Sequence, residues 1–252
     1  MPRLKLTEEQ WSKLKVILQD ARIYDKPRLR DTVEGMLYRI RVGCPWRDVP
    51  REFGNWNSIF KRFNEWSKNE KLFLVFKILS RDPDLEWEFI DGTIVKAHQH
   101  SSGAAKISRE VDHAVGRSVG GLTSKIHLAV DSSGNPIDFE ITGGEVHDAK
   151  MAPTLIAKLP RSEYVIADRG YDSEAIREQI RTKKSVPIIP RKRNSKTGNA
   201  DIDWALYKYR HLVENAFARL KHFRGIATRF DKLKRNFAGA LALACAFIWL
   251  PL

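Results

Sequence analysis

Apolar side chains recur three and four positions apart through the first eighty residues, a spacing that predicts amphipathic helices. Thr7, which precedes two glutamates and a glutamine, is placed to cap the first helix, and this helix continues through Leu18. A second helix is expected over Arg30–Val42, where the pattern repeats. The segment Gly43–Pro50 interrupts the pattern with glycine and proline and predicts a turn.

A third helix is indicated by the apolar residues between Trp56 and Trp66, and it also carries the basic residues Lys61 and Arg62. Short helices around a turn, with basic and aromatic residues on the last one, resemble a helix-turn-helix. Such bundles also serve as dimerisation modules or as caps, so these alternatives stay open beside DNA binding. We expect residues 1–82 to form an all-helical, helix-turn-helix-like DNA-binding domain.

From residue 85 the apolar period changes from that of a helix to that of a strand. The expected elements, in chain order, are strands at Trp87–Val95, Leu122–Val130 and Pro136–Thr142, a helix at Asp148–Lys158, a strand at Tyr164–Ala167, a helix at Ser173–Thr182 and a strand at Val186–Ile189. A helix that carries Glu214 follows. This order is typical of a mixed sheet with helices on its faces, so an α/β domain is expected over residues 83–252.

The stretch Ser101–Gly121 is rich in serine and glycine, and we expect it to be a mobile loop near the functional site. Gly116 and Gly121 have the spacing of a phosphate-binding loop. Leu122 stands where that motif requires lysine, so no phosphate-binding loop is predicted.

The last apolar run, Phe237–Leu250, contains no charged residue but is shorter than the roughly 20 residues that a membrane span needs. We expect it to form a buried helix, and we expect no membrane partner. The first ten residues lack an apolar signal core, and Cys44 and Cys245 fit neither a disulfide framework nor a zinc site. A cytoplasmic protein is therefore expected.

The net charge of +13 indicates a polyanionic partner. The charge is uneven, because residues 81–180 carry 17 acidic against 11 basic residues, whereas residues 181–252 carry 16 basic against 4 acidic residues. An acidic middle between basic segments suits a carboxylate site flanked by surfaces that hold DNA. Charge alone leaves open a basic protein that binds RNA or membrane surfaces.

Three carboxylates stand out by their local settings. Asp91 and Asp168 each follow an apolar run that predicts a strand, and Glu214 lies within a helical pattern. Either aspartate alone is a common turn former or helix cap. Together, the three acids supply what a two-metal phosphoryl-transfer site requires: several anionic oxygens that hold two hard dications about 3.5–4 Å apart.

The predicted helix around Glu214 has a polar stripe. At about 100° per residue, Tyr207, Arg210, Glu214 and Lys221 fall within a sector of roughly 60°. Arg210 lies four residues before Glu214, which allows an ion pair on an ordinary solvated face. The opposite face is apolar, so the stripe is held at a fixed angle, where the carboxylate could bind metal and the cations phosphate.

A basic loop precedes this helix. Its basic residues include Lys183, Lys184, Arg191, Lys192 and Arg193. A charge run of this kind is commonly a solvated segment. Its position just before the Glu214 helix favours contact with DNA phosphates, as we also expect for Lys61 and Arg62 in the helical domain.

Taken together, Ile90-Asp91-Gly92-Thr93, Ala167-Asp168-Arg169-Gly170-Tyr171 and the Tyr207/Arg210/Glu214/Lys221 spacing resemble bacterial insertion-sequence transposases of the fourth and fifth insertion-sequence group. The Y-x2-R-x3-E-x6-K signature of that group is matched without departure. The stretches Gly120–His127 and Gly43–Pro50 are similar to the same family, so the resemblance covers almost the whole chain.

The resemblance implies an RNase H-like catalytic domain in which Asp91, Asp168 and Glu214 form a DDE triad that binds two Mg²⁺ ions, for which Mn²⁺ substitutes. It implies an enzyme that nicks double-stranded DNA at the element ends and joins the freed 3′-hydroxyl to target DNA. Tyr207, Arg210 and Lys221 would be accessory residues, the latter two holding phosphates. A homodimer or larger assembly on DNA in the bacterial cytoplasm, associated with the nucleoid, is expected.

Two other functions stay open on the sequence alone: a host nuclease of the same fold, and a DNA-binding regulator without catalysis. Among the histidines, His98, His100 and His147 are weak candidates for metal ligands because Mg²⁺ prefers oxygen. His127, on a predicted strand, is expected to be a hydrogen-bonded structural residue.

Overall fold

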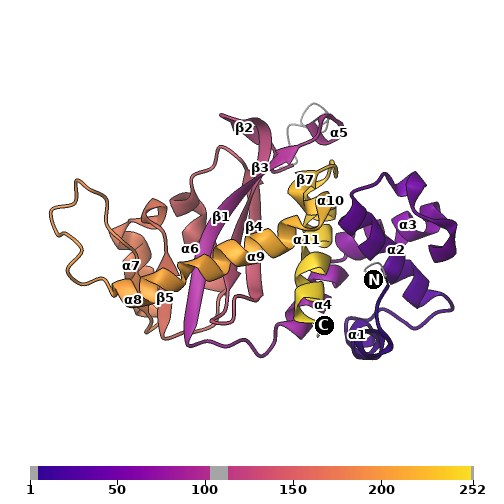
Figure 1. The fold of residues 1–252 in the computed structure, drawn as a ribbon, viewed down its shortest axis with the longest axis horizontal. Helices are drawn as coiled ribbons and strands as arrows, with labels where there is room; N and C mark the ends of the chain where they lie inside the picture. Colours follow the sequence, from indigo (N-terminus) through magenta and orange to yellow (C-terminus); the bar gives the residue numbers. More distant parts are fainter. Residues whose placement is uncertain (1–4, 103–112, 251–252) are drawn as a thin grey trace. The chain divides into compact units, whose positions relative to one another are not determined.

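The computed structural model describes residues 5–102 and 113–250 (Figure 1). The chain divides into two compact units, neither of which is contiguous in sequence. The first unit comprises Met1–Arg81, Val95–Val115 and Arg219–Leu252, and the second comprises Asp82–Ile94 and Gly116–Ala218. The first segment of the helical unit therefore ends at Arg81, but the unit also takes in the C-terminal region.

The first unit is built mainly from helices. They are α1 (Glu8–Asp20), α2 (Leu29–Val42), α3 (Trp56–Lys68), α4 (Lys71–Leu79), α5 (Gln99–Ser102), α10 (Arg224–Ala227) and α11 (Lys234–Trp249). The predicted start of α1 is confirmed, because the Thr7 hydroxyl accepts from the Gln10 N–H while the Gln10 side chain accepts from the Thr7 N–H. This reciprocal capping satisfies two amides that have no partner within the helix.

The helix-turn-helix-like prediction for this unit is confirmed only in its helical content. Between α2 and α3 lies the segment from Gly43 to Asn55, which contains two 3₁₀ turns, Trp46–Asp48 and Arg51–Phe53. A helix-turn-helix has a turn of about 3–4 residues, so α2 and α3 are not joined in that way. Proline before each 3₁₀ turn favours these extended entries and excludes a continuous helix.

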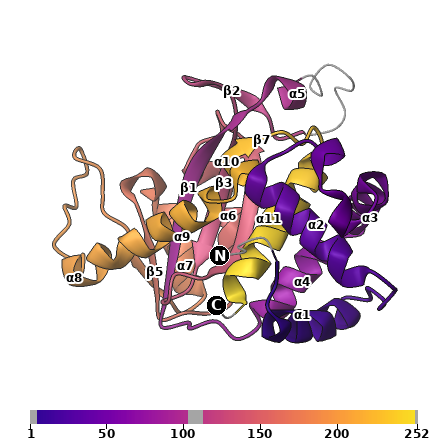
Figure 2. The same cartoon turned by 45° about the vertical axis from the view of Figure 1, so that its right-hand side comes forward.

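Helix α11 confirms the prediction that the final apolar run forms a buried helix. Its residues from Phe237 to Ala246 are largely buried, and it packs against α3 and α4 (Figures 1 and 2). Among the helices that the structure describes, none has both the length and the apolar character required to traverse a bilayer.

A buried ion pair also ties the two ends of the chain together within the first unit. Both guanidinium nitrogens Nη1 and Nη2 of Arg39 donate to the Asp231 carboxylate, at 2.9 and 3.2 Å. The two side chains are 5% and 6% exposed. Arg39 also lies over the Trp46 ring, so this cation is enclosed by a carboxylate and an aromatic face.

The second unit holds most of a mixed sheet. Its strands are β1 (Trp87–Ala97), β2 (Gly116–Ser118), β3 (Gly121–Val130), β4 (Pro136–Gly143), β5 (Tyr164–Ala167) and β6 (Val186–Ile188). The order is β4-β3-β1-β5-β6, with β2 also paired to β3. β4 runs antiparallel to β3, whereas β5 runs parallel to both β1 and β6. The expected mixed sheet is confirmed, and β1 stands at its centre.

One loop prediction and one strand prediction need correction. The segment Ser101–Gly121 is not a loop throughout, because Gly116–Ser118 forms β2 and pairs antiparallel with the start of β3; residues 103–112 lie outside the described residues. The strand at Asp91 also does not end at Val95 but continues to Ala97, where it passes into the first unit and pairs with β7 (Thr228–Arg229). Pairing of Lys96 and Ala97 with β7 extends β1 beyond the apolar residues from which its end was predicted.

The helices of the second unit are α6 (Asp148–Lys158), α7 (Glu174–Thr182), α8 (Trp204–Tyr207) and most of α9 (His211–Lys221). The helix predicted around Glu214 is interrupted, because a 3₁₀ turn at Lys208–Arg210 separates α8 from α9. On β1, Trp87 contacts Tyr209 beside α9, whereas Gly92 lies against Asp148 of α6. Since successive strand residues point to opposite faces, α9 and α6 cover opposite faces of the sheet (Figures 1 and 2).

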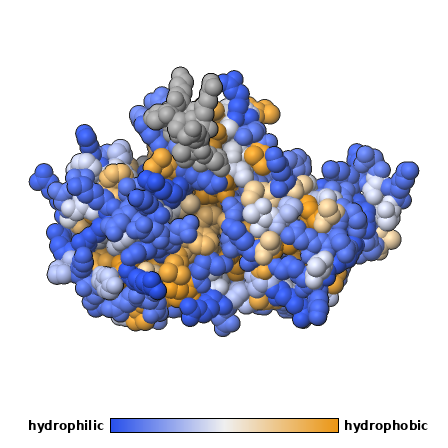
Figure 3. All heavy atoms as spheres, turned by 180° about the vertical axis from the view of Figure 1, so that it is seen from behind, coloured by the Kyte–Doolittle hydropathy of each residue, from blue (hydrophilic) through white to orange (hydrophobic). Residues whose placement is uncertain are grey.

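The face of the molecule in Figure 3 is predominantly hydrophilic, and its hydrophobic residues form scattered groups. Large apolar side chains that are exposed include Tyr24, Val119 and Trp204. Isolated exposed apolar residues are ordinary on protein surfaces.

Candidate active site

The parallel register of β1 and β5 brings the first two acids together. Ile90 pairs with Ala167, so Asp91 and Asp168 are adjacent residues at the point where this pairing ends. Asp91 thus lies inside β1 rather than at its end. Asp168 Oδ1 accepts the N–H of Gly170 at 2.7 Å and caps a 3₁₀ turn, which fixes the second carboxylate at the end of β5.

Arg210 links the first and third acids. Its Nη1 donates to Asp91 Oδ2 at 2.7 Å, and its Nη2 donates to Glu214 Oε1 on the next helical turn. The expected pair between Arg210 and Glu214 is therefore confirmed. The contact between Arg210 and Asp91, which are 119 residues apart, could not be predicted from helical spacing. Two carboxylates from a strand and a helix converge on one cation.

Burial is the main influence on Asp91. It raises the pKa of this carboxyl group from 3.8 to about 6, an effect that the Gly92 N–H and the Arg210 guanidinium oppose. The neighbouring carboxylates Asp168 and Asp148 raise it further. A half-buried carboxylate among like charges favours additional positive charge close by.

The chemistry of this donor set fits hard divalent cations, which prefer carboxylate oxygens. The guanidinium of Arg210 already stands as a cation between Asp91 and Glu214. Within residues 5–102 and 113–250, no group of three or more histidine, cysteine, aspartate or glutamate side chains is spaced closely enough to hold one ion. If two ions bind, each would therefore be held by one or two of the three acids, and oxygens of DNA or water would complete its coordination.

The accessory residues of the predicted stripe differ in their surroundings. Tyr207, at the end of α8, is half-buried and hydrogen bonded to Arg210, and burial raises the pKa of its phenol. Lys221 is the exposed last residue of α9 and belongs to the first unit. Within the stripe, Arg210 thus contacts both Tyr207 and Glu214, although the 3₁₀ turn at Lys208–Arg210 separates Tyr207 from α9.

A second polar group lies on the other face of β1 and was not predicted. Asp148 begins α6, and its carboxylate lies 3.3 Å from Lys125 Nζ and 3.4 Å from His127 Nδ1, both on β3. The Tyr171 hydroxyl is buried without a hydrogen-bond partner among the described residues. Burial, then the charges of Asp148, Asp91 and Asp168, raise the pKa of this phenol well above its usual value. Because aspartate is common at the start of a helix, the sequence around Asp148 contains no specific sign of this polar group.

The histidines keep structural positions. His127 is buried and its Nε2 lies 2.9 Å from Thr142 Oγ1, which agrees with the predicted hydrogen-bonded role. His147 caps α6 by accepting the Ala149 N–H. The rings of His98 and His100 contact each other in a tilted arrangement in the first unit, with centroids 4.7 Å apart.

The predicted DNA contacts divide into exposed and engaged side chains. Lys183 donates to the carbonyls of Ile156 and Leu159. Arg191 is buried and forms a two-pronged ion pair with Asp201. Both cations therefore already have partners within the protein.

The remaining basic residues of the loop are more accessible. The exposed ones are Lys184, Lys192 and Arg193. On α3, Lys61 is exposed, whereas Arg62 donates to Thr32 Oγ1 at 2.8 Å and is half-buried. Of these predicted phosphate contacts, Lys61, Lys184, Lys192 and Arg193 are thus the ones with exposed side chains.

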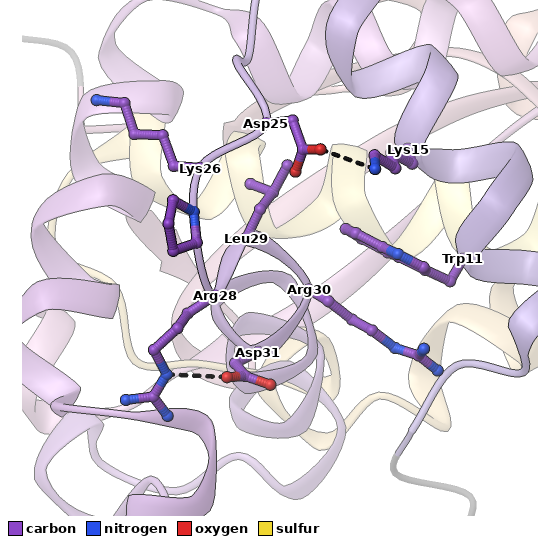
Figure 4. Close-up of a pocket in the computed structure, with 9 residues that line it drawn as sticks. Trp11, Lys15, Asp25, Lys26, Arg28, Leu29, Arg30 and Asp31 are labelled. Atoms are coloured by element: carbon purple, nitrogen blue, oxygen red, sulfur yellow. Dashed lines mark hydrogen bonds and ion pairs between the residues drawn. The ribbon is translucent and has the colours of Figure 1, made fainter.

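A pocket of about 560 Å³ lies in the helical unit, between α1 and the start of α2 (Figure 4). Its lining includes two ion pairs, Lys15–Asp25 at 2.7 Å and Arg28–Asp31 at 2.9 Å. The three acids of the candidate site do not line it.

Comparison with known families gives the class of this protein. Residues 89–249 match the model described as "Transposase DDE domain", and residues 6–75 match the one described as "Putative transposase of IS4/5 family". The chain therefore belongs to the DDE transposases of the IS4/5 type, an enzyme family whose members use divalent metal. Its mixed sheet, flanked by helices, is the α/β architecture expected from the sequence.

Individual bacterial transposases are also similar to this chain. A Brucella ovis protein described as "Putative transposase for insertion sequence element IS6501" is 36% identical over 129 residues, which cover 51% of this chain and 99% of the relative. The transposase for insertion sequence element IS1106 of Neisseria meningitidis serogroup B is 32% identical over 130 residues, 49% of this chain and 45% of the relative.

Solved structures offer only remote likenesses. A piggyBac transposase synaptic complex with hairpin DNA has a TM-score of 0.38 at 11% identity, over 77% of this chain and 51% of that chain. A Mos1 mariner paired-end complex with Mn has a TM-score of 0.30 at 12% identity, over 91% and 82% of the two chains.

Proposed function

We propose that this transposase binds the ends of its own insertion sequence and catalyses metal-dependent strand cleavage followed by strand transfer. The supporting observation is the convergence of Asp91 and Glu214 on Arg210, with Asp168 beside Asp91 on the neighbouring strand. Two aspartates that are adjacent on neighbouring strands, and a helix glutamate that shares Arg210 with the first of them, are an arrangement suited to phosphoryl transfer at a phosphodiester.

Asp91, Asp168 and Glu214 would hold two Mg²⁺ ions, for which Mn²⁺ would substitute. When bound, such ions activate the attacking oxygen and stabilise the leaving oxygen of an in-line displacement. The protein supplies the geometry: β1 and β5 fix the two aspartates, and the α9 helix fixes the glutamate. Burial of Asp91 strengthens its interaction with cations, because the local dielectric is lower than that of water.

Arg210 is proposed to neutralise the acids before DNA binds and then to hold a phosphate oxygen. Its guanidinium has five N–H donors, so it can exchange a carboxylate for a phosphate at the same site. Tyr207, which is bonded to Arg210, orients the strand or water. Lys221 holds a phosphate, and Lys221→Ala should weaken binding of element ends and strand transfer; an unchanged variant would refute this role.

The DNA partner is double-stranded and includes both element ends and target. We propose Lys61, Lys184, Lys192 and Arg193 as phosphate contacts because their side chains are exposed. Two ends must be cut together, so a homodimer or larger assembly on DNA is proposed. The enzyme would act in the bacterial cytoplasm on nucleoid DNA.

A cleavage and joining assay tests this function. Purified protein is incubated with DNA that carries the sequences flanking its own gene, with Mg²⁺ or Mn²⁺, and nicks and joined products are scored for wild type and Glu214→Gln. We expect metal-dependent nicking and joining that Glu214→Gln abolishes, while binding of DNA is kept. Cutting without joining would indicate a nuclease, and binding without cutting in both proteins would indicate a regulator.

A further inference from the structure

We infer that Asp148 is a positioning residue for Asp91, acting from the opposite face of β1 through Gly92. This inference rests on the proposed function, because it concerns how the first acid of the triad is held for metal. It adds a residue that neither the Tyr/Arg/Glu/Lys stripe nor the three acids include.

The Asp148 carboxylate is held by Lys125. Lys125 Nζ donates to the Val146 carbonyl at 2.7 Å and to Asp148 Oδ2 at 3.3 Å. The lysine side chain is 11% exposed and the aspartate 28% exposed. A largely buried ammonium that bonds both a backbone carbonyl and the carboxylate has little freedom, so it fixes Asp148 relative to β3.

His127 limits the carboxylate on its other side. His127 Nε2 lies 2.9 Å from Thr142 Oγ1, which anchors the buried ring on β3 against β4. Nδ1 on the other side of the ring lies 3.4 Å from Asp148 Oδ1. The Asp148 carboxylate is thus confined between the His127 ring and Lys125.

Gly92 transmits this position to Asp91. A methyl group built on Gly92 would overlap Asp148 Oδ1 and lie 3.1 Å from Asp148 Cγ, so the carboxylate occupies the space of the missing side chain. The N–H of the same glycine donates to Asp91 Oδ1 at 2.7 Å. The backbone unit that orients the metal-binding carboxylate is therefore packed directly against Asp148.

The expected effect is a change in metal affinity. Functional side chains must be held within about 0.5 Å, and loss of a residue that orients a metal ligand commonly weakens metal binding by roughly 10–100-fold. We expect Gly92→Ala and Asp148→Ala each to weaken Mn²⁺ binding by about tenfold.

The combined variant distinguishes positioning from a general charge effect. In Gly92→Ala/Asp148→Ala the new methyl group enters the space that the carboxylate has left, where the nearest remaining atom, Lys125 Cδ, is at an ordinary 3.5 Å. The double variant should therefore bind Mn²⁺ no more weakly than Gly92→Ala alone. If the two effects multiply to about 100-fold, residues 92 and 148 act independently and the inference is wrong.

The experiment titrates the full chain with Mn²⁺ alone and measures free Mn²⁺ by electron paramagnetic resonance. Glu163→Gln removes the same charge from an exposed position of the same unit and should bind as wild type. Circular dichroism and Tm verify folding. Should Asp148→Ala not fold, Asp148→Asn, which preserves the shape, is expected to weaken binding about tenfold because Lys125 loses its counter-charge; wild-type affinity would overturn the inference.

Asp91→Asn separates this inference from the proposed function. If Asp91→Asn binds Mn²⁺ as tightly as wild type, the proposed metal site is wrong and the inference falls with it. If Asp91→Asn loses binding while folded Asp148→Asn and Gly92→Ala do not, only the positioning role is refuted.

Discussion

Arg210 shows how far single residues could be interpreted from the sequence. Its pairing with Glu214 follows from helical spacing, because residues four apart share a face. Its second bond, to Asp91, depends on the packing of α9 against β1 and has no local signal. The same holds for Asp148, whose contact with Gly92 joins two residues from different elements.

Glu88 is a buried residue that the sequence did not single out. It accepts a hydrogen bond from the Ser162 hydroxyl at 3.0 Å and is 1% exposed on β1. Burial raises the pKa of this carboxyl group from 4.5 to about 7, against the opposing effects of Ser162 and Lys183. The folded protein thus keeps a proton that the unfolded chain releases.

The raised pKa of Glu88 predicts a pH dependence of stability. Its contribution to the free energy of unfolding is complete below about pH 4.5 and is lost as the pH rises toward 7. Glu88→Gln removes this titration, so its free energy of unfolding should not show this loss. The difference in free energy of unfolding, variant minus wild type, should therefore rise by about 2–3 kcal/mol from pH 5 to pH 8. Urea unfolding at both pH values measures this. Exposed Glu86→Gln is the control, and an equal shift there would contradict the account.

At the scale of elements, the apolar period located most helices and strands of the second unit. α6 and β5 have the predicted bounds because each is a short, uniform pattern between clear turn residues. β2 escaped prediction because Gly116 and Ser118 have low strand propensity, and only pairing with β3 makes them a strand. The break between α8 and α9 has no glycine or proline to mark it.

The buried ion pair between Arg39 of α2 and Asp231, which follows β7, leads to a prediction about stability. Asp231→Asn leaves the Arg39 guanidinium buried with only a neutral partner, and such a loss costs about 3–5 kcal/mol. Asp25→Asn removes the exposed pair with Lys15, both about 40% exposed, and should cost less than about 1 kcal/mol. Urea unfolding at pH 7 compares them. An equal loss of free energy of unfolding in the two variants would show that the buried Arg39–Asp231 pair stabilises the fold no more than the exposed pair does.

At the scale of the whole molecule, the acidic and the basic segments of the chain hold different parts of the candidate site. The acidic middle of the sequence contains Asp91 and Asp168, and the basic segment after residue 181 contains the exposed Lys192 and Arg193. The units themselves could not be delimited from sequence, because α11 joins the N-terminal helices through packing between distant residues. The division into a DNA-binding domain at 1–82 and a catalytic domain at 83–252 remains a prediction.

DNA binding should depend on salt through the exposed basic loop. Each phosphate contact contributes about 0.9 to the slope of log K against log salt. Lys192→Glu/Arg193→Glu should therefore reduce that slope by about 2, measured by fluorescence anisotropy with duplex DNA between low and moderate salt. Lys13→Glu, on an exposed position of α1, serves as the control. An unchanged slope in the double variant would remove the loop from the DNA interface.

The most direct test of the central claim is single-turnover nicking of an element end by Asp91→Asn, Asp168→Asn and Glu214→Gln, with Glu163→Gln as control. If the three acids act as one metal-binding unit, each should slow nicking by at least about 1,000-fold with DNA binding retained, and the Asp91→Asn/Glu214→Gln double variant should be no slower than either single variant. Nicking within about tenfold of wild type by any one of the three single variants would contradict the account.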